Sequence, residues 1–340
     1  MATIDYHHTS KLGEGTFGQI KNVFDDDGNE WAVKLFGPDG YKCLDLGTLR
    51  EISILTILRD LHPNIISIHD IIYKDSKIGM VMPKLYGNFE DIVNANNLHK
   101  IDKLRISYML LDAVSFLHNM NIIHRDIKTS NILMNHNIEP VLADFSLAKV
   151  FDGNEKTSHT PGMGTPTYTS PEIVNGKMYT LVSDVWSLGV VFYELFSGKL
   201  LTQSKNKYAI EFLMTKMQNL NPDVQLTAVM KGMLKYESKD RMTCDEVMKL
   251  PIYINSFKPF KPNKTFNIVN VRPNNISTMA NYYHSETKEN IKYCQYISEK
   301  MFASEYYDIS DVFTKKEVDE YINVELNIFK KMNYTLYIKF

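Results

Sequence analysis

A glycine-rich segment near the start of the chain has the residue types needed to bind phosphate groups. Gly13, Gly15 and Gly18 form the pattern GxGxxG, and aliphatic Ile20 stands two positions after the last glycine. Glycines let backbone N–H groups approach a phosphate with no Cβ in the way. Plain turns and dinucleotide-binding loops share this pattern, but a dinucleotide loop would open a helix, whereas alternating strand-like residues follow here. We therefore expect a phosphate-binding loop between two strands.

Two charged residues stand in apolar surroundings and are candidates for a buried ion pair. Lys34 lies inside an apolar strand, and Glu51 lies on the mostly apolar helix that follows it. A lone charge among apolar side chains is costly unless it is paired. Lys34 could instead point to solvent, but we predict that it pairs with Glu51 and contacts the α- and β-phosphates of a nucleotide.

The most specific signal is the octapeptide His124–Asn131, which reads His-Arg-Asp-Ile-Lys-Thr-Ser-Asn. A carboxylate at Asp126 can orient a substrate hydroxyl and accept its proton. Lys128 can neutralise a γ-phosphate as it moves, and Asn131 can ligate a metal ion. Asp144 follows an apolar strand and is the second expected ligand, because Mg²⁺ takes carboxylate oxygens. The spacing predicts phosphoryl transfer.

The elements that position these residues fall into two groups. Before Asn88, alternating patterns and a Gly-containing acidic turn predict a hairpin, a helix and two further strands, over residues 19–24, 30–36, 45–60, 65–72 and 77–82. Beyond Asn88, helical spacing dominates, most clearly over 104–120 and over 182–196, which is apolar nearly all round. The sequence therefore predicts an α+β protein with a small β-rich lobe and a larger helical lobe, joined near Pro83–Tyr86.

By these motifs and their order, residues 6–254 resemble a eukaryotic-type protein kinase domain. The resemblance implies the bilobal protein kinase fold, ATP and Mg²⁺ as cofactors, and proteins as substrates. Lys128 and the run Gly164–Tyr168 resemble serine/threonine rather than tyrosine kinases. Ser170-Pro171-Glu172 stands for the usual Ala-Pro-Glu, which implies that Glu172 pairs with Arg241.

The same resemblance assigns a nucleotide pocket. Leu12, Ile20, Ala32 and Leu133 would enclose the adenine, with Met82 at the back and Pro83–Leu85 as the hinge. The full set expected to bind nucleotide is Leu12, Gly13, Glu14, Gly15, Thr16, Phe17, Gly18, Gln19, Ile20, Ala32, Lys34, Met82, Leu85 and Leu133.

Within the kinase family, Leu46–Glu51 resembles the cyclin-binding helix of the cyclin-dependent kinase branch. Thr160 falls at that branch's activating phosphorylation site, where Arg125, and Arg50 as a second candidate, could bind the phosphate in bidentate fashion. The alternative is that Thr160 is simply a loop residue.

Two departures from the family pattern carry expectations of their own. Ser146 replaces the glycine of Asp-Phe-Gly, which restricts the backbone where kinases switch between forms, so we expect retained Mg²⁺ binding and altered switching. Gly164 and Thr169 replace residues characteristic of proline-directed kinases, which leaves specificity for Ser-Pro or Thr-Pro sites open.

The C-terminal region differs from the kinase-like region. Residues 255–275 hold several prolines among Lys and Asn, as in a linker, and 276–340 is predicted to be helical. Within this helical region, three segments resemble part of a cyclin box, namely Cys294–Lys300, Phe313–Val318 and Val324–Tyr334. The resemblance implies that Lys300 and Glu325 would face the regulatory helix of a kinase. We expect the helical region to activate the kinase in cis, helped by its tether, or else to be a packing extension.

Composition narrows the possible partners. A net charge of -2 gives no reason to expect nucleic acid or an anionic membrane as a partner. Three scattered cysteines make no disulfide framework, and no apolar stretch could span a bilayer, so we expect an intracellular protein, cytoplasmic or nuclear. Richness in Asn, Ile, Lys and Tyr suits an AT-rich genome such as that of a large DNA virus.

Two functions from other classes compete with the enzyme. A pseudokinase scaffold is disfavoured because it usually lacks one of the residues that are present here, namely Lys34, Asp126, Asn131 and Asp144. A cyclin mimic that binds cell-cycle regulators through its tail is the other alternative.

Overall fold

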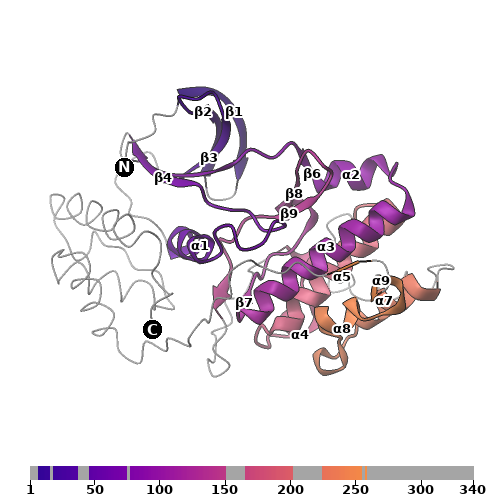
Figure 1. Ribbon diagram of the computed structural model, residues 1–340. Coiled ribbons are helices and arrows are strands. Elements are labelled where there is room, and N and C mark those ends of the chain that lie inside the picture. The colour runs from indigo at the N-terminus through magenta and orange to yellow at the C-terminus, as the bar shows by residue number, and fades with distance from the viewer. Residues whose placement is uncertain are drawn as a thin grey trace. The chain divides into compact units, whose positions relative to one another are not determined.

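The computed structural model describes residues 7–15, 18–36, 46–74, 77–150, 165–201, 224–254 and 257–258. These residues form two compact parts: an N-terminal part made of those within 7–60 and 67–84, and a C-terminal part made of those within 61–66 and 85–258. Figure 1 shows their helices and strands. Thr16, Phe17, Thr160 and the region with Lys300 and Glu325 lie outside the described residues, as does all of the predicted linker except 257–258.

A five-stranded antiparallel sheet forms the N-terminal part. Its strands, in spatial order, are β1 (His7–Gly15), β2 (Gly18–Phe24), β3 (Glu30–Phe36), β5 (Lys77–Pro83) and β4 (Asp70–Lys74). The predicted hairpin is β2–β3. Its turn is held by Asp25, whose Oδ1 accepts the N–H of Asp27 at 3.1 Å and that of Asn29 at 2.7 Å. Gly28 follows with φ 81°, a left-handed conformation that glycine adopts at no steric cost.

The segment predicted as a strand over 65–72 divides between the two parts, so that prediction was wrong at its start. The strand β4 begins only at Asp70. The N–H of Ile66 instead donates to the carbonyl of Leu142 at 2.9 Å, and Ile65 bridges to Leu142. Both isoleucines are thus buried in the C-terminal part. The helix predicted over residues 45–60 is present as α1 (Leu46–Ile57).

Helices dominate the C-terminal part. They are α2 (Phe89–Ala95), α3 (Lys100–Asn119), α4 (Pro171–Val174), α5 (Leu181–Ser197), α7 (Val224–Met233), α8 (Cys244–Met248) and α9 (Pro251–Ile254), with short 3-10 turns η1 (Thr129–Asn131), η2 (Pro166–Tyr168) and η3 (Ser238–Asp240). Its short strands form two sheets, β6–β8–β9 (Gly87–Asn88, Ile132–Met134, Pro140–Leu142) and β10–β7 (Lys149–Val150, Ile122–Ile123).

The central helix of this part is α5, as its apolar sequence predicted. Its N-terminus carries a capping box between Thr180 and Ser183, and it ends at Gly198, whose φ is 66°. It packs against α3 and α7 (Figure 1), and Trp186 and Phe192 on it are fully buried. Among the described residues, no helix is both long and apolar enough to cross a membrane.

Candidate active site

Lys34 and Glu51 form a buried ion pair in the N-terminal part. Lys34 Nζ on β3 lies 2.7 Å from Oε1 and 2.8 Å from Oε2 of Glu51 on α1. The two residues are 6% and 1% exposed, so each charge depends on the other for compensation. The pairing expected from the sequence is therefore present, and the contact of Lys34 with phosphates remains a prediction.

The glycine-rich segment runs through the hairpin of β1 and β2. Gly15 pairs with Gly18 at its end, and a strand follows the last glycine rather than a helix, as predicted. Leu12, Gly13 and Glu14 lie on β1. Gly18 is the first residue of β2, and Gln19 is the second.

Residues expected around the adenine occupy paired positions in the strands. Ile20 on β2 lies opposite Lys34 on β3, and Ala32 on β3 lies opposite Met82 on β5. Leu85 and Leu133 belong to the C-terminal part, where Leu133 on β8 pairs with Val141 on β9. Their role in nucleotide binding remains a prediction.

Two residues of the octapeptide donate hydrogen bonds to the carboxylate of a third, Asp126. Lys128 Nζ donates to Asp126 Oδ2 at 2.7 Å, and Asn131 Nδ2 donates to the same oxygen at 2.8 Å and to the Asp126 carbonyl at 2.9 Å. These bonds hold the Asp126 side chain in one orientation. A carboxylate fixed in this way can accept a proton from a hydroxyl placed at its other oxygen.

The backbone before Asp126 is held by Asp184, a residue whose role the sequence analysis missed. Asp184, on the first turn of α5 and 1% exposed, accepts the N–H of His124 at 2.8 Å and that of Arg125 at 2.9 Å. Arg125 has φ 66°, a left-handed conformation that costs a non-glycine residue about 1–2 kcal/mol. The two bonds to a buried carboxylate offset this cost. The available signal was an acid at the start of an apolar helix.

Asn131 and Asp144 offer oxygen ligands at the same end of two paired strands. β8 follows Asn131 and β9 precedes Asp144, and the Asn131 carbonyl accepts the N–H of Ala143 at 2.9 Å. Because the amide nitrogen of Asn131 donates to Asp126, its side-chain oxygen is the atom that can ligate a cation. One carboxylate and one amide oxygen, completed by phosphate oxygens, fit the ligand set of Mg²⁺. No group of three or more His, Cys, Asp or Glu residues within the described ranges could hold a metal.

His124 connects the octapeptide to the segment that carries Asp144. Its Nε2 lies 3.1 Å from the carbonyl of Ala143, and its Nδ1 accepts the N–H of Asp126 at 3.3 Å. The Nε2–H tautomer satisfies both bonds. The ring also packs edge-on against Phe145, with centroids 4.7 Å apart. The fully buried histidine thereby fixes Asp144 next to the octapeptide.

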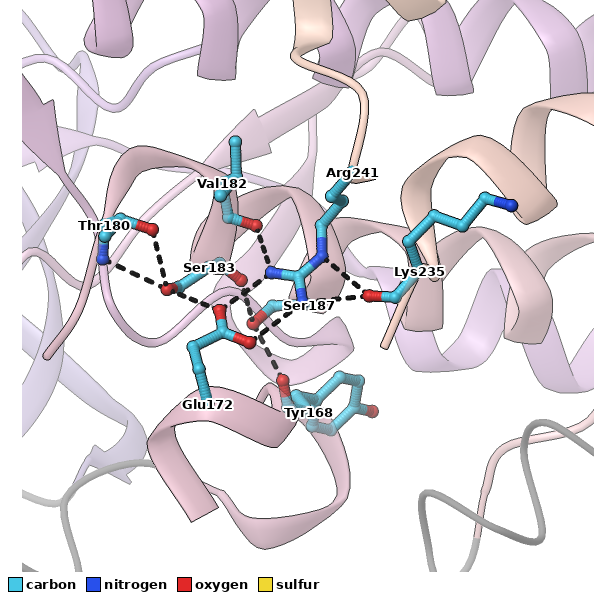
Figure 2. A network of polar contacts seen from close by, with 8 residues as sticks. All are labelled: Tyr168, Glu172, Thr180, Val182, Ser183, Ser187, Lys235 and Arg241. Carbon is cyan, nitrogen blue, oxygen red and sulfur yellow. Dashed lines mark hydrogen bonds and ion pairs between the residues drawn. The ribbon is translucent and has the colours of Figure 1, made fainter. Parts of the chain in front are cut away.

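Glu172 and Arg241 form the ion pair expected from the Ser-Pro-Glu motif (Figure 2). Arg241 donates to both oxygens of Glu172 at 2.8 Å and to the carbonyls of Val182 and Lys235, and Ser183 Oγ adds a bond to Glu172 at 2.9 Å. Burial by itself would raise the pKa of Glu172, but the hydrogen bonds and charge of Arg241 outweigh it and hold the pKa below its ordinary value. The pair braces α4 against α5.

A second buried network links the octapeptide to α5 through Tyr168 and was not foreseen from the sequence. The Tyr168 hydroxyl donates to Glu194 Oε2 at 2.8 Å and lies 2.9 Å from Thr129 Oγ1, while the N–H of Leu201 donates to Glu194 Oε1 at 2.7 Å. Burial raises the pKa of Glu194 to about 7. The only sequence signal was Glu194, an acid in the later turns of a mostly apolar helix.

Arg125, the expected partner of a phosphorylated Thr160, has contacts of its own. Its Nε donates to the carbonyl of Leu147 at 2.6 Å, and its guanidinium lies 5.8 Å from the centre of the Tyr179 ring. Because Thr160 lies outside the described residues, the phosphate site remains a prediction.

Comparison with known proteins identifies the family to which this arrangement belongs. The family model of the protein kinase domain matches residues 6–253, and the chain therefore belongs to the protein kinase domain family. The chain is similar to the sucrose non-fermenting protein kinase 1 of Fusarium virguliforme, with 30% identity over 303 residues, covering 82% of this chain and 43% of the relative.

Two yeast proteins are also similar. The SNF1-like protein kinase ssp2 of Schizosaccharomyces pombe is 31% identical over 256 residues, covering 71% of this chain and 42% of that protein. The carbon catabolite-derepressing protein kinase of Saccharomyces cerevisiae is 35% identical over 204 residues, covering 58% of this chain and 31% of that protein. The matches span less than half the length of these relatives. They lend no support to the cyclin-dependent kinase branch or to the cyclin box, which stay predictions.

Proposed function

We propose that this chain is a serine/threonine protein kinase that transfers the γ-phosphate of ATP to serine and threonine hydroxyls of protein substrates, with Mg²⁺ as cofactor. The observation that carries the proposal is the cluster of Lys128 and Asn131 around the Asp126 carboxylate. Membership of the protein kinase domain family supports it, and so do the names of the similar proteins, which are protein kinases.

In the proposed reaction, the substrate hydroxyl oxygen attacks the γ-phosphorus while the bond to the β–γ bridging oxygen of ATP breaks. Asp126 orients the hydroxyl and accepts its proton, and ADP leaves with the bridging oxygen. Lys128, 2.7 Å from Asp126, neutralises charge on the moving phosphoryl group. Lys34, held by Glu51, contacts the α- and β-phosphates. Because the transition state is loose and anionic, this positioning supplies most of the catalysis.

Asn131 and Asp144 would hold the Mg²⁺, which when bound neutralises phosphate charge. The apolar residues Leu12, Ile20, Ala32, Met82 and Leu133 would enclose the adenine, and the glycines of the β1–β2 hairpin would approach the phosphates through their N–H groups. The assignment of these residues to the pocket is proposed from the family resemblance.

The experiment that tests the proposal is phosphate transfer from radiolabelled ATP to generic protein substrates. Asp126→Asn removes the proton acceptor at nearly constant shape and should reduce the rate by roughly 10²–10⁴-fold. The matched control is Asp240→Asn, the same change at an exposed site on η3, which should leave the rate unchanged. A wild-type chain that neither binds magnesium nucleotide nor labels any substrate would refute the proposal and favour a pseudokinase scaffold.

We further propose that the region 276–340 activates the kinase in cis through contact with the helix that carries Glu51. The cyclin-like segment around Lys300 and the segment around Glu325 are the expected contacts. The proposal rests on the family resemblance, and a tether makes such a contact effective without high affinity. If the tail alone captured a cell-cycle regulator in the absence of kinase activity, the cyclin-mimic function would be favoured instead.

A further inference from the structure

Ser146 contacts the proposed metal ligand Asp144 directly. Its hydroxyl donates to Asp144 Oδ1 at 2.6 Å, and its backbone N–H lies 3.4 Å from the same oxygen. Ser146 is 3% exposed, and Phe145 between the two residues is fully buried. The sequence predicts that this serine restricts the backbone, with Mg²⁺ binding retained and switching altered. The structure adds a contact that a glycine at this position could not make.

The contact matters because the backbone at Asp144 is strained. Asp144 has φ 59°, in the left-handed region that non-glycine residues rarely adopt. A carboxylate that ligates a metal is oriented by the groups that hydrogen-bond to it. Ser146 supplies one, and its own burial maintains the bond, since a buried hydroxyl without a partner costs about 1–3 kcal/mol.

We propose that the Ser146 hydroxyl is a positioning group for divalent-cation binding, holding the Asp144 carboxylate in the orientation that ligates the cation of the metal–nucleotide complex. This inference rests on the proposed function and deepens it, because it names a determinant of metal affinity at the same site. Groups that hydrogen-bond to a metal-ligating carboxylate orient it, and their removal typically weakens metal affinity by about 10–100-fold.

A purely structural role is the competing explanation. In that case the Asp144–Ser146 bond would only stabilise the turn between them, as side chains of aspartate often do. The two roles differ in what they predict. A turn-stabilising bond affects the unfolding temperature without changing the metal dependence of nucleotide binding, whereas a positioning bond changes the metal dependence.

The test is nucleotide binding by the full chain, measured by titration calorimetry with ATP over a series of Mg²⁺ concentrations and again in EDTA. In Ser146→Ala, the Mg²⁺ concentration for half-maximal enhancement of ATP affinity should rise about tenfold, with the affinity in EDTA unchanged. Ser146→Thr keeps a hydroxyl and should stay near the wild type. Asp144→Asn, which removes the ligand charge, should lose most of the metal dependence.

The outcomes separate this inference from the proposed function. A Ser146→Ala chain with wild-type metal dependence would overturn the inference alone, whether or not its unfolding temperature falls. If Ser146→Ala does not fold, Ser146→Gly serves instead, because glycine lacks the hydroxyl but tolerates any backbone conformation. A wild-type chain without metal-dependent nucleotide binding would overturn the proposed function and this inference with it.

Discussion

Buried charges at the site are held by specific partners, and the partner decides how each one titrates. The guanidinium of Arg241 holds the pKa of Glu172 below its ordinary value. Burial raises the pKa of Glu194 to about 7, because the hydrogen bonds from Tyr168 and Leu201 lower it by less than burial raises it. Both carboxylates are within 5% of complete burial. The difference follows from charge: only Glu172 faces a cation that repays its desolvation.

Glu194 should therefore make stability depend on pH. Its pKa is about 7 in the folded chain against an ordinary 4.5. Between these two pH values the folded chain keeps a proton on Glu194 that the unfolded chain has released. The free energy of unfolding should fall as pH rises from about 4.5 to about 7, by on the order of 3 kcal/mol at about 1.4 kcal/mol per pKa unit. Urea unfolding at a series of pH values measures this.

The matched variants are Glu194→Gln and Glu237→Gln. The first mimics the protonated acid, so it should flatten the decline between pH 5 and 7 and be more stable than the wild type at pH 8. The second makes the same change at an exposed position and should keep the wild-type profile. If Glu194→Gln and the wild type declined equally, another group would be responsible.

At the scale of elements, α5 connects most of the site in the C-terminal part. Its first turn carries Asp184, which holds the octapeptide, and Ser183, which bonds to Glu172. Its later turns carry Ser187 and Glu194, which bond to Tyr168. The position of α5 against its neighbours is therefore expected to control the geometry around Asp126.

Gly189 allows the close packing of α5 against the end of α7. A Cβ at this position would lie 2.9 Å from two side-chain atoms of Leu234 and 3.1 Å from Met233 Cβ. Gly189→Ala should thus lower the free energy of unfolding by about 1–3 kcal/mol, even though alanine favours helix over glycine. Chemical denaturation of the purified chain provides the measurement.

The control is Gly87→Ala on β6, where the added Cβ would meet only Met134 Cβ at an ordinary 3.7 Å. We expect its effect to stay below about 1 kcal/mol. Adding Leu234→Ala to Gly189→Ala should make room for the methyl group. The double variant should therefore lose less free energy of unfolding than the sum of the losses in the two single variants. Strictly additive losses would contradict the packing explanation.

For the molecule as a whole, the proposed activation in cis predicts a difference between the full chain and a chain ending at Ile254. The shorter chain keeps the residues matched by the kinase family model. Its rate of phosphate transfer should fall at least severalfold, and adding region 276–340 as a separate polypeptide should restore little at micromolar concentration, because the tether is lost. Equal rates would leave 276–340 as a packing extension.

Local patterns in the sequence determined much of this protein. The motif residues, their order, the hairpin β2–β3 with its acidic turn, and the helices α1, α3 and α5 all follow from periodicity and turn chemistry. The ion pairs Lys34–Glu51 and Glu172–Arg241 were also predicted, since each motif implied its partner. These features depend on neighbouring residues or on the family resemblance.

Tertiary structure alone decided which distant surfaces meet. The sequence predicts that Ile65 and Ile66 begin a strand. In the structure both residues instead contact the backbone of Leu142 at the end of β9, some 76 residues further along the chain. The bonds from Asp184 to the octapeptide and from Glu194 to Tyr168 likewise join segments far apart in sequence. No local pattern encodes such contacts, because hydrophobic burial is non-directional and the choice of partner depends on how whole elements pack.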